Sequence, residues 1–584
     1  MGNMQRIKDT NNFSEIEAFA GNPEKLTTTL SEVIGKFNLK SHLAAFDVLK
    51  SKGLAISSLV NILVILPFYG FASVCALVKA KIRPSDLEMG KKDVYYDVKN
   101  NEFIDWRTLL LLHAKRFRYL MSQNKSTTID GVKAIIFDDT PIKKTGIKTE
   151  KVSVNHDHVS GKFILGYKLL VCGFWDGGSF IPLDFSFHRE RGTKVDKLIS
   201  SFKKAKNVLE NAKLVLAKHE TLLLKKEQSL INARTKYASN PIKTNHVRLL
   251  SAEVICEKTN AEHEKLTQDL ILKQNAVDQA KKQLKKFYKH ERLFGLTSKE
   301  RKEQYKKAIT PGSYGHIRRR ETDKSKIDLM TSMLIRSVKN GFIPDYVLID
   351  SWFFCHELLS LLSTLKNGSI KLVSMVKINN QNFFDCQANK EMNVKTLLQK
   401  HLPDAKVCKK LKSNYIKVTC KYKGIRVNLF FVKMGRSQNW HLLLTTDLSL
   451  SFIDLMKVYQ VRWSIEVFFK ECKQYLNLGK CKSTSFDAQI ADTTVSMLQH
   501  IMLSYYKRIN CQQSYDGIFR AISKEMVEMD LVSRMIDIIW ELIEIIASIE
   551  GIDFIELQEE LMRNDKVATL FLKMIPQRAL EKSA

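Results

Sequence analysis

The stretch YVLIDSWFFCHELLSLLSTLKNGSIKLVSMV, residues 346–376, decides the fold class. Its first four residues are a short apolar run of the kind that forms a buried strand, and the run stops at Asp350. A helix is expected over 354–365, and a second apolar strand over 370–376. This alternation of strand and helix predicts an α/β layer fold.

The same pattern of short apolar strands begins earlier in the chain. Residues 133–137, KAIIF, form another short apolar run, which ends at Asp138 and Asp139. Strands are expected over 167–174 and 180–187, and the WDGGS segment between them has the Asp-Gly-Gly content of a hairpin turn. The α/β core is therefore predicted to start near residue 126 and to continue after residue 290.

A long interruption separates the two halves of this core. Its apolar residues recur at alternating spacings of four and three, a 3.5-residue period typical of coiled coils. Asn240-Pro241 divides two similar arms, so residues 194–290 are predicted to form an antiparallel coiled-coil hairpin. The expected contact positions are 198, 202, 205, 209, 212, 216, 219, 223, 226, 230, 233 and 237, followed by 249, 252, 256, 259, 263, 266, 270, 273, 277, 280, 284 and 287.

The outer regions differ from the core. Residues 1–125 have a helical pattern with frequent Lys and Arg, so they could dock on a DNA duplex, whereas 379–446 are rich in strand-forming residues. The tail is helical, apolar and acidic, and its negative charge suits self-association better than DNA contact. We divide the chain into 1–125, 126–193, 194–290, 291–378, 379–446, 447–510 and 511–584.

The charge balance indicates a polyanionic partner. Lys and Arg total 93 against 62 for Asp and Glu, a formal net charge of +31. Such a surplus favours nucleic acid, with an anionic membrane surface as the competing interpretation, and it argues against acidic small ligands as the main substrates.

Two other features bear on location. The ten cysteines form no C-x-x-C pair, which fits reduced cytosolic thiols better than a zinc ribbon or a disulfide framework. The apolar stretch 54–78 has the length of a membrane span, but Pro67 and several polar residues interrupt it, so two buried helices are expected instead. With no apolar leader at the N-terminus, we expect a cytoplasmic protein without a membrane partner.

One segment, YQVRWSIEVFFKECK at 459–473, carries candidate chemistry. On a continuous helix, Tyr459, Arg462, Glu466 and Lys473 would fall within one stripe about 60° wide. A carboxylate that could bind a metal would then be flanked by a phenol, a guanidinium and an ammonium that could hold phosphates. A solvated face with helix-spaced ion pairs is the alternative, although the aromatic neighbours indicate a packed helix.

Asp139 and Asp350 add two carboxylates at expected strand ends, where either could also simply cap a turn or a helix. Together with Glu466 they make a phosphoryl-transfer site plausible, with two Mg²⁺ ions, or Mn²⁺ in their place, sharing hard oxygen ligands. The scattered cysteines offer no competing site for a softer metal.

The string Tyr459-x2-Arg462-x3-Glu466-x6-Lys473 resembles the Y-R-E-K signature of the IS4-family DDE transposases of bacterial insertion sequences. Asp139, which Thr140 follows, resembles the first catalytic acid of that family, with Asp138 as the alternative. Asp350 resembles the second acid and Glu466 the third. Trp440 resembles a tryptophan that stacks on a flipped base in hairpin-forming relatives, although a core or surface role is an equally good interpretation.

The resemblance implies an RNase H-like catalytic core with a β-rich insertion between the second Asp and the Glu. It also implies a cut-and-paste transposase that acts on double-stranded DNA, namely the terminal inverted repeats and the target, in a bacterial nucleoid and as a homodimer in a synaptic complex. The coiled-coil hairpin is a departure from the family pattern. A catalytically silent DNA-binding protein that bridges duplexes through this hairpin is the alternative, and both predict salt-sensitive DNA binding.

Overall fold

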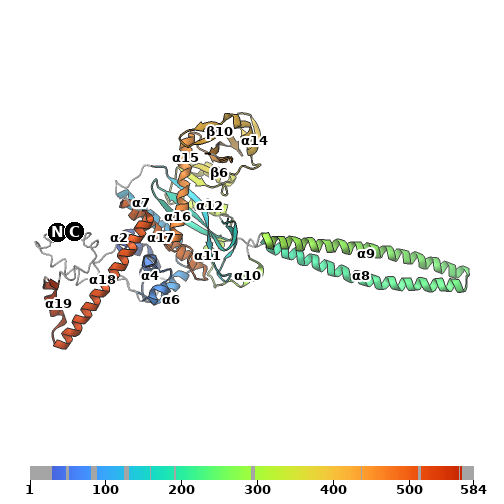
Figure 1. Ribbon diagram of the computed structural model, residues 1–584, viewed down its shortest axis with the longest axis horizontal. Helices are drawn as coiled ribbons and strands as arrows, with labels where there is room; N and C mark the ends of the chain where they lie inside the picture. The colour runs from blue at the N-terminus through green and yellow to red at the C-terminus, as the bar shows by residue number, and fades with distance from the viewer. Residues whose placement is uncertain are drawn as a thin grey trace. The chain divides into compact units, whose positions relative to one another are not determined.

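The computed structural model describes residues 29–47, 52–80, 89–123, 131–157, 160–189, 193–290, 296–435, 437–510, 514–564 and 566–567. They form two compact units, traced by residue colour in Figure 1. The first unit comprises residues 1–142, 168–188 and 305–584, and the second comprises 143–167 and 189–304.

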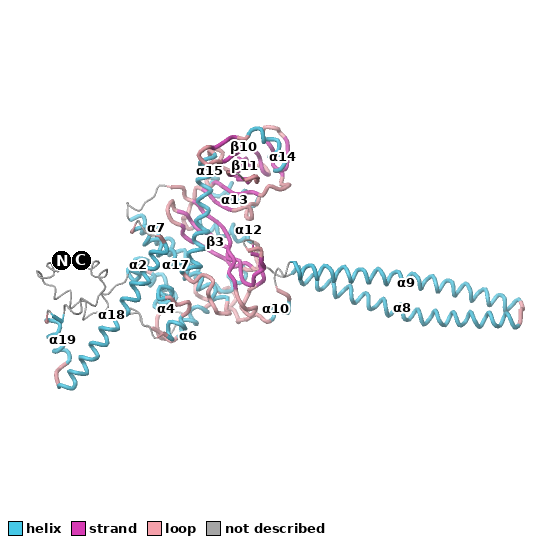
Figure 2. Tube along the Cα trace, viewed as in Figure 1, coloured by secondary structure: helices cyan, strands magenta, loops and turns pink. Residues whose placement is uncertain are grey.

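A large mixed sheet organises the first unit (Figure 2). Its strands follow the order β4-β3-β1-β5-β6-β12-β11-β10-β7-β8, and β9 also pairs with β10. Strand β5 is parallel to β1 and β6, whereas β12 runs antiparallel to β6 and β11. The bounds are β1 Ala134–Lys143, β3 Lys162–Trp175, β4 Phe180–His188, β5 Tyr346–Ile349, β6 Lys371–Val376, β7 Asn382–Asp385, β8 Lys390–Asn393, β9 Lys406–Cys408, β10 Ser413–Tyr422, β11 Ile425–Met434 and β12 His441–Thr445.

Strand β1 is longer than the sequence predicts. It continues to Lys143, so Asp138 and Asp139 lie inside the strand rather than at its end. The physical reason is that alternating burial resumes after the two acids: Thr140 and Ile142 are buried, and the residues after each of them are more exposed. The expected strands at β4, β5 and β6 are confirmed to within a residue or two.

Helices surround this sheet, and the most buried of them is α17 (Phe486–Ile509). Every residue of α17 from Phe486 to Tyr505 is buried except Asp492, as expected of a helix packed on all sides. The other helices of this unit are α2 Thr29–Phe37, α3 Leu39–Asp47, α4 Ile56–Ile65, α5 Val74–Lys79, α6 Lys92–Asn100, α7 Trp106–Gln123, α11 Tyr314–Glu321, α12 Lys326–Lys339, α13 His356–Thr364, α14 Val394–His401, α15 Phe452–Gln460, α16 Ser464–Tyr475, α18 Tyr515–Glu550 and α19 Phe554–Arg563.

A buried ionic network ties three of these helices to the sheet. Asp184 on β4 accepts bonds from Arg107 at 2.9 Å and from Arg336 at 2.6 Å, and Arg318 lies 3.7 Å away. Burial alone would raise the pKa of Asp184, but the three guanidinium groups outweigh it and hold that pKa below its usual value. The carboxylate therefore joins α7, α11 and α12 to one strand.

The apolar stretch 54–78 forms two short helices, as predicted. Pro67 lies in a 3₁₀ turn, Leu66–Tyr69, that ends α4 before α5 begins. Within the described ranges, no helix is both long and apolar enough to cross a bilayer.

The second unit holds β2 (Ser153–Asp157), paired with the start of β3, and a long helical hairpin. The hairpin consists of α8 (Thr193–Ser239) and α9 (Lys243–His290), and α10 (Ser298–Lys302) follows it. The arms are antiparallel, since the ring of Tyr237 lies 5.2 Å from that of His246 and the ring of His219 lies 5.8 Å from that of His263. The less exposed residues of both arms follow the predicted positions, so the predicted hairpin is confirmed.

Candidate active site

The parallel pairing of β1 with β5 brings two acids to one edge of the sheet. Ile136 pairs with Leu348, and two residues further along each strand lie Asp138 and Asp350. Residues in register on neighbouring strands share a face of the sheet. The register therefore places the two acids side by side, and the negative charge of Asp350 contributes to raising the pKa of Asp138.

Arg462 joins Asp138 to the third candidate acid. Its guanidinium donates to Asp138 Oδ2 at 3.1 Å and to Glu466 Oε1 at 2.6 Å. The Arg462 side chain is only 14% exposed, so both ion pairs are partly shielded from water. A cation of the chain itself therefore lies between two of the acids.

The signature segment is not the single continuous helix that its spacing predicts. Helix α15 ends at Gln460, residues 461–463 form a 3₁₀ turn, and α16 starts at Ser464. A 3₁₀ turn inside a helix is tighter than an α-turn and often marks a functional site. Here it carries Arg462 between the helices that hold Tyr459 and Glu466.

The buried side of α16 explains how this segment is held in place. Ile465, Phe468, Phe469 and Cys472 are buried, and the ring of Phe468 packs 5.0 Å from that of Phe180 on β4. This packing fixes α16 beside the sheet that carries the acids.

The two remaining signature residues also contact this site. Lys473 Nζ donates to Thr140 Oγ1 at 2.6 Å, so it links α16 to β1. The guanidinium of Arg462 lies 5.7 Å from the ring centre of Tyr459. Burial raises the pKa of the Tyr459 hydroxyl to about 12, with Arg462 opposing the shift and Asp350 adding to it. Tyr459 is therefore a hydrogen-bond donor at neutral pH.

Asp138 and Asp139 have different neighbours. Asp139 forms an ion pair with Lys326, the first residue of α12, rather than with Arg462. Burial raises the pKa of Asp138 to about 7, Arg462 opposes the shift, and the negative charge of Asp350 adds to it. The sequence prediction favoured Asp139 as the first acid, but the contacts to Arg462 and the interaction with Asp350 belong to Asp138.

Trp440 lies one residue before β12 and is partly buried. Leu442 on β12 pairs with Val376, the last residue of β6, so Trp440 lies at the sheet edge that also carries Asp350. Strands β5, β6 and β12 are successive neighbours spaced about 4.8 Å apart. Trp440 is therefore two strands away from Asp350 and displaced by three residues along the strand direction, because Asp350 is level with Met375 and Leu443.

The acids supply the hard oxygen ligands that Mg²⁺ prefers. Among the residues that the structure describes, however, no three carboxylate, imidazole or thiol groups stand close enough to hold a metal ion. The donor set fits a divalent cation in its chemistry. It fits in geometry only once Arg462 gives up the bonds that now tie Asp138 to Glu466.

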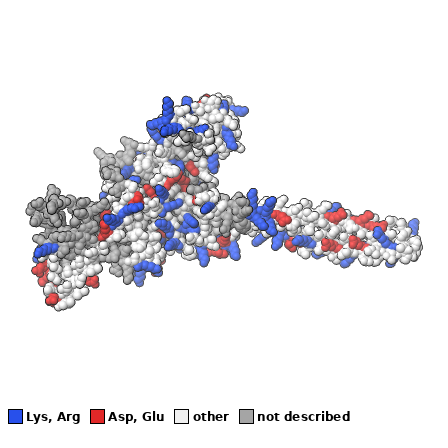
Figure 3. Space-filling view, viewed as in Figure 1, with Lys and Arg blue, Asp and Glu red and all other residues white. Residues whose placement is uncertain are grey.

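The β-rich insertion has a charge pattern that composition alone did not single out. Residues 379–446 contain 13 Lys and Arg against 3 Asp and Glu, so about a third of the net charge lies in this segment. One of the three acids, Asp385, is fully buried and bonds Lys400 at 2.8 Å. Figure 3 shows Lys and Arg side chains over the insertion. A local charge count along the sequence would have found this surface.

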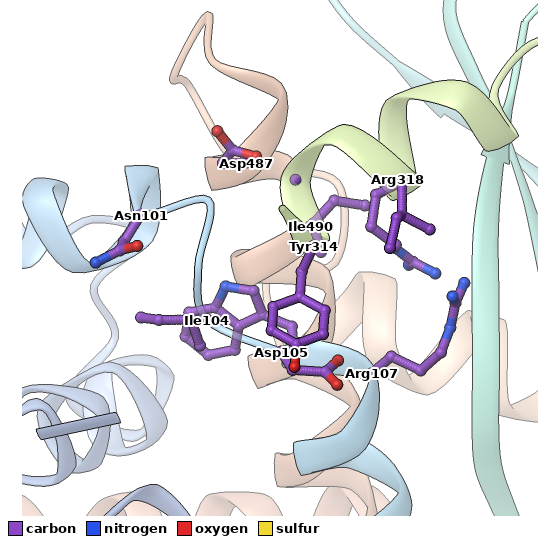
Figure 4. A pocket seen from close by; sticks show the side chains of 11 residues that line it. Asn101, Ile104, Asp105, Arg107, Tyr314, Arg318, Asp487 and Ile490 are labelled. Carbon is purple, nitrogen blue, oxygen red and sulfur yellow. The ribbon is translucent and has the colours of Figure 1, made fainter. Parts of the chain in front are cut away.

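A separate cavity of about 180 Å³ lies where the start of α7 meets α11 and α17 (Figure 4). Tyr314 and Arg107 are among its lining residues, as is Asp487, which pairs with Arg319 at 2.6 Å. None of the sequence-predicted site residues lines this cavity.

Residues 224–498 match the family model described as Transposase DDE domain. The match includes Asp350 and the whole signature segment, and it begins after the two acids of β1. No curated protein matches the chain. DDE transposases carry out DNA transposition and generally use divalent metal ions. The segment 224–498 is therefore similar to a transposase DDE domain.

Proposed function

We propose that this protein is a cut-and-paste DNA transposase of the IS4 type, which cleaves the ends of its element and joins them to target DNA in the bacterial nucleoid. The observation that carries the proposal is that Arg462 bonds both Asp138 and Glu466 beside Asp350, and that Asp350, Arg462 and Glu466 lie in the segment that matches the DDE domain. A structural ion-pair cluster alone would not require acids from two strands and a helix at one exposed sheet edge.

The strand order supports an RNase H-like core. In the part β4-β3-β1-β5-β6, β1 lies at the centre, with β3 and β4 on one side and the two parallel strands β5 and β6 on the other. This is the order of RNase H-like folds, in which the first strand lies at the centre of the sheet.

In this proposal, Asp350, Glu466 and one acid of β1, Asp139 or Asp138, hold two Mg²⁺ ions, with Mn²⁺ as a substitute. When bound, such ions activate a water or a 3′-hydroxyl and stabilise the leaving oxygen. The protein itself fixes the carboxylates on rigid elements and keeps them charge-balanced through Arg462 before substrate arrives.

Arg462, Lys473 and Tyr459 hold phosphate oxygens of the transposon end. Arg462 can form a bidentate fork, Lys473 supplies a point charge, and Tyr459 donates a hydrogen bond. Trp440, on the same sheet edge, stacks on a base of the DNA end.

DNA binding extends beyond the acids. The basic insertion, residues 379–446, contacts the phosphate backbone, and the helical region up to residue 125 binds the DNA end. When lysines and arginines neutralise DNA phosphates, the DNA releases its bound counterions. The affinity for DNA therefore falls steeply with added salt.

Helix α18 supports a homodimer. Its C-terminal half exposes aliphatic side chains at spacings of three and four residues, a stripe that a second copy of the same helix would cover. Each of these residues is at least 44% exposed, which is costly for a monomer in water. They are Leu531, Met535, Ile538, Leu542, Ile545 and Ile549.

The test is cleavage of a DNA fragment that carries the element's end. Glu466→Gln should abolish cleavage and leave end binding nearly intact, whereas retained cleavage would remove Glu466 from the site. Asp138→Asn and Asp139→Asn, assayed side by side, identify the first acid. Chelation should silence the wild type, and Mn²⁺ should restore it.

A silent DNA-bridging protein is the second candidate. The observation in its favour is that the described residues contain no ready-made metal group, since Arg462 lies between the acids. Metal-dependent nicking of a specific end would exclude it.

A further inference from the structure

Trp352 lies beside the acids yet points into solvent. It is 59% exposed, although large aromatic side chains usually bury most of their surface. It occupies the turn directly after β5, and its backbone N–H donates to Asp350 Oδ1 at 2.8 Å. The amide of Phe353 donates to the Asp350 carbonyl at 3.3 Å, so the turn is fixed to the second acid.

Two lysines approach the indole ring. Lys377 Nζ lies 4.7 Å from the ring centre, and Lys326 Nζ lies 5.8 Å from it. Lys377 follows β6, the strand next to β5, and Lys326 also pairs with Asp139. The indole is therefore surrounded by positive charge at the sheet edge that holds the candidate acids.

This combination has a specific chemical meaning. An exposed aromatic face attracts apolar surface in general, but a lipid or an ordinary protein partner would not require two ammonium groups against the ring. A nucleobase offers a π-face for stacking, and its phosphates offer charges for the lysines. Stacking requires the base to be unpaired, because a base within a duplex is covered on both faces by its neighbours.

We infer that Trp352 is a stacking platform for an unpaired nucleobase beside the candidate acids, with Lys326 and Lys377 on the flanking phosphates. The inference rests on the proposed function and deepens it by naming a contact to the base itself. It is separate from the site at Trp440, because β6 lies between the strands that precede these two tryptophans.

The experiment uses the full chain with EDTA present, so that no cleavage occurs. Two single strands of about 15 nucleotides are compared, an oligothymidylate and an abasic strand of the same length and charge. The wild type should bind oligothymidylate about tenfold more tightly, since stacking contributes strongly per base. Because Trp440 is also proposed to stack on a base, the variants are made in a Trp440→Ala background. There Trp352→Ala should bind both strands equally, and Trp352→Phe should keep part of the preference.

Tyr314→Ala is the control. Tyr314 on α11 is 44% exposed and lies outside the parts of the chain that we propose bind DNA. This variant should keep the full preference for oligothymidylate over the abasic strand. Lys377→Ala should weaken the binding of both strands by the same factor.

In the Trp440→Ala background, a preference that survives in Trp352→Ala, or one lost equally in Tyr314→Ala, would overturn the inference. If the wild type prefers oligothymidylate over the abasic strand but never cleaves DNA, the proposed function is refuted and the inference about Trp352 stands. The two outcomes can be separated because the binding assay does not depend on cleavage.

Discussion

Replacing Asp138 with Asn should make the protein more stable at alkaline pH, even though Asp138 is a candidate catalytic acid. Its side chain is 18% exposed, and burial raises its pKa to about 7, although Arg462 lies 3.1 Å away. An unfolded chain ionises the same carboxyl near pH 4. Between these two values the native state retains a proton that the unfolded state has lost.

The sign and size of the effect on the unfolding free energy follow from this difference in pKa. Because the folded pKa is raised, ionisation favours unfolding, and stability falls as pH rises from about 4 to about 7. Three pH units at about 1.4 kcal/mol each give a penalty of about 4 kcal/mol, complete above pH 7. Asn carries no charge, so Asp138→Asn removes the penalty.

The assay is urea unfolding of wild type and variant at pH 5 and pH 8, followed by tryptophan fluorescence. The gain in unfolding free energy for Asp138→Asn should be about 3 kcal/mol larger at pH 8 than at pH 5. Asp139→Asn is the control, and it should lower stability because it weakens the ion pair with Lys326. Equal gains at both pH values would refute the reasoning and place Asp138 in an ordinary aqueous setting.

Three further predictions test other parts of the structure. Asp184→Ala should destabilise the first unit by about 3–5 kcal/mol, since the buried Arg318 and the partly buried Arg107 and Arg336 lose their counter-charge; a change below 1 kcal/mol in urea unfolding would contradict this. His219→Leu should raise the thermal stability of the hairpin by about 1–2 kcal/mol, because both ring nitrogens are buried without a hydrogen bond; an unchanged or lower helical melting temperature would count against it. The double variant Ile538→Asp with Leu542→Asp should convert a dimer to a monomer in analytical ultracentrifugation, and an unchanged dimer would exclude α18 as the interface.

The hairpin of α8 and α9 could be predicted in detail because its cause is local. A 3.5-residue repeat sustained over two arms specifies which residues face the partner arm, and Pro241 in the connecting turn separates the arms. The sequence thus predicted even the polar residue His219 at a contact position. Strand β5 could be predicted equally well, because it is an apolar run of four residues that ends at an acid.

The candidate site was only partly predictable. Helical spacing brought the signature residues together, but the 3₁₀ turn at 461–463 contains no Gly or Pro that would announce it. The choice between Asp138 and Asp139 depends on which of the two side chains lies on the same face of the sheet as Asp350. That depends on the register of β1 with β5, which cannot be predicted from the local sequence because the two strands are far apart in the chain. The partnership of Asp139 with Lys326, 187 residues away, is likewise a product of tertiary folding.

The two ion pairs that Arg462 forms with Asp138 and Glu466 have a thermodynamic consequence. A guanidinium that grips a DNA phosphate must loosen its hold on the carboxylates, and carboxylates that ligate Mg²⁺ must release the guanidinium. Under the proposed function, DNA and the divalent cation therefore each raise the affinity of the protein for the other, and linkage requires the two effects to be equal. Magnesium affinity measured on the protein alone should underestimate the affinity in the DNA complex, so that ions accumulate at the acids only when a substrate is present.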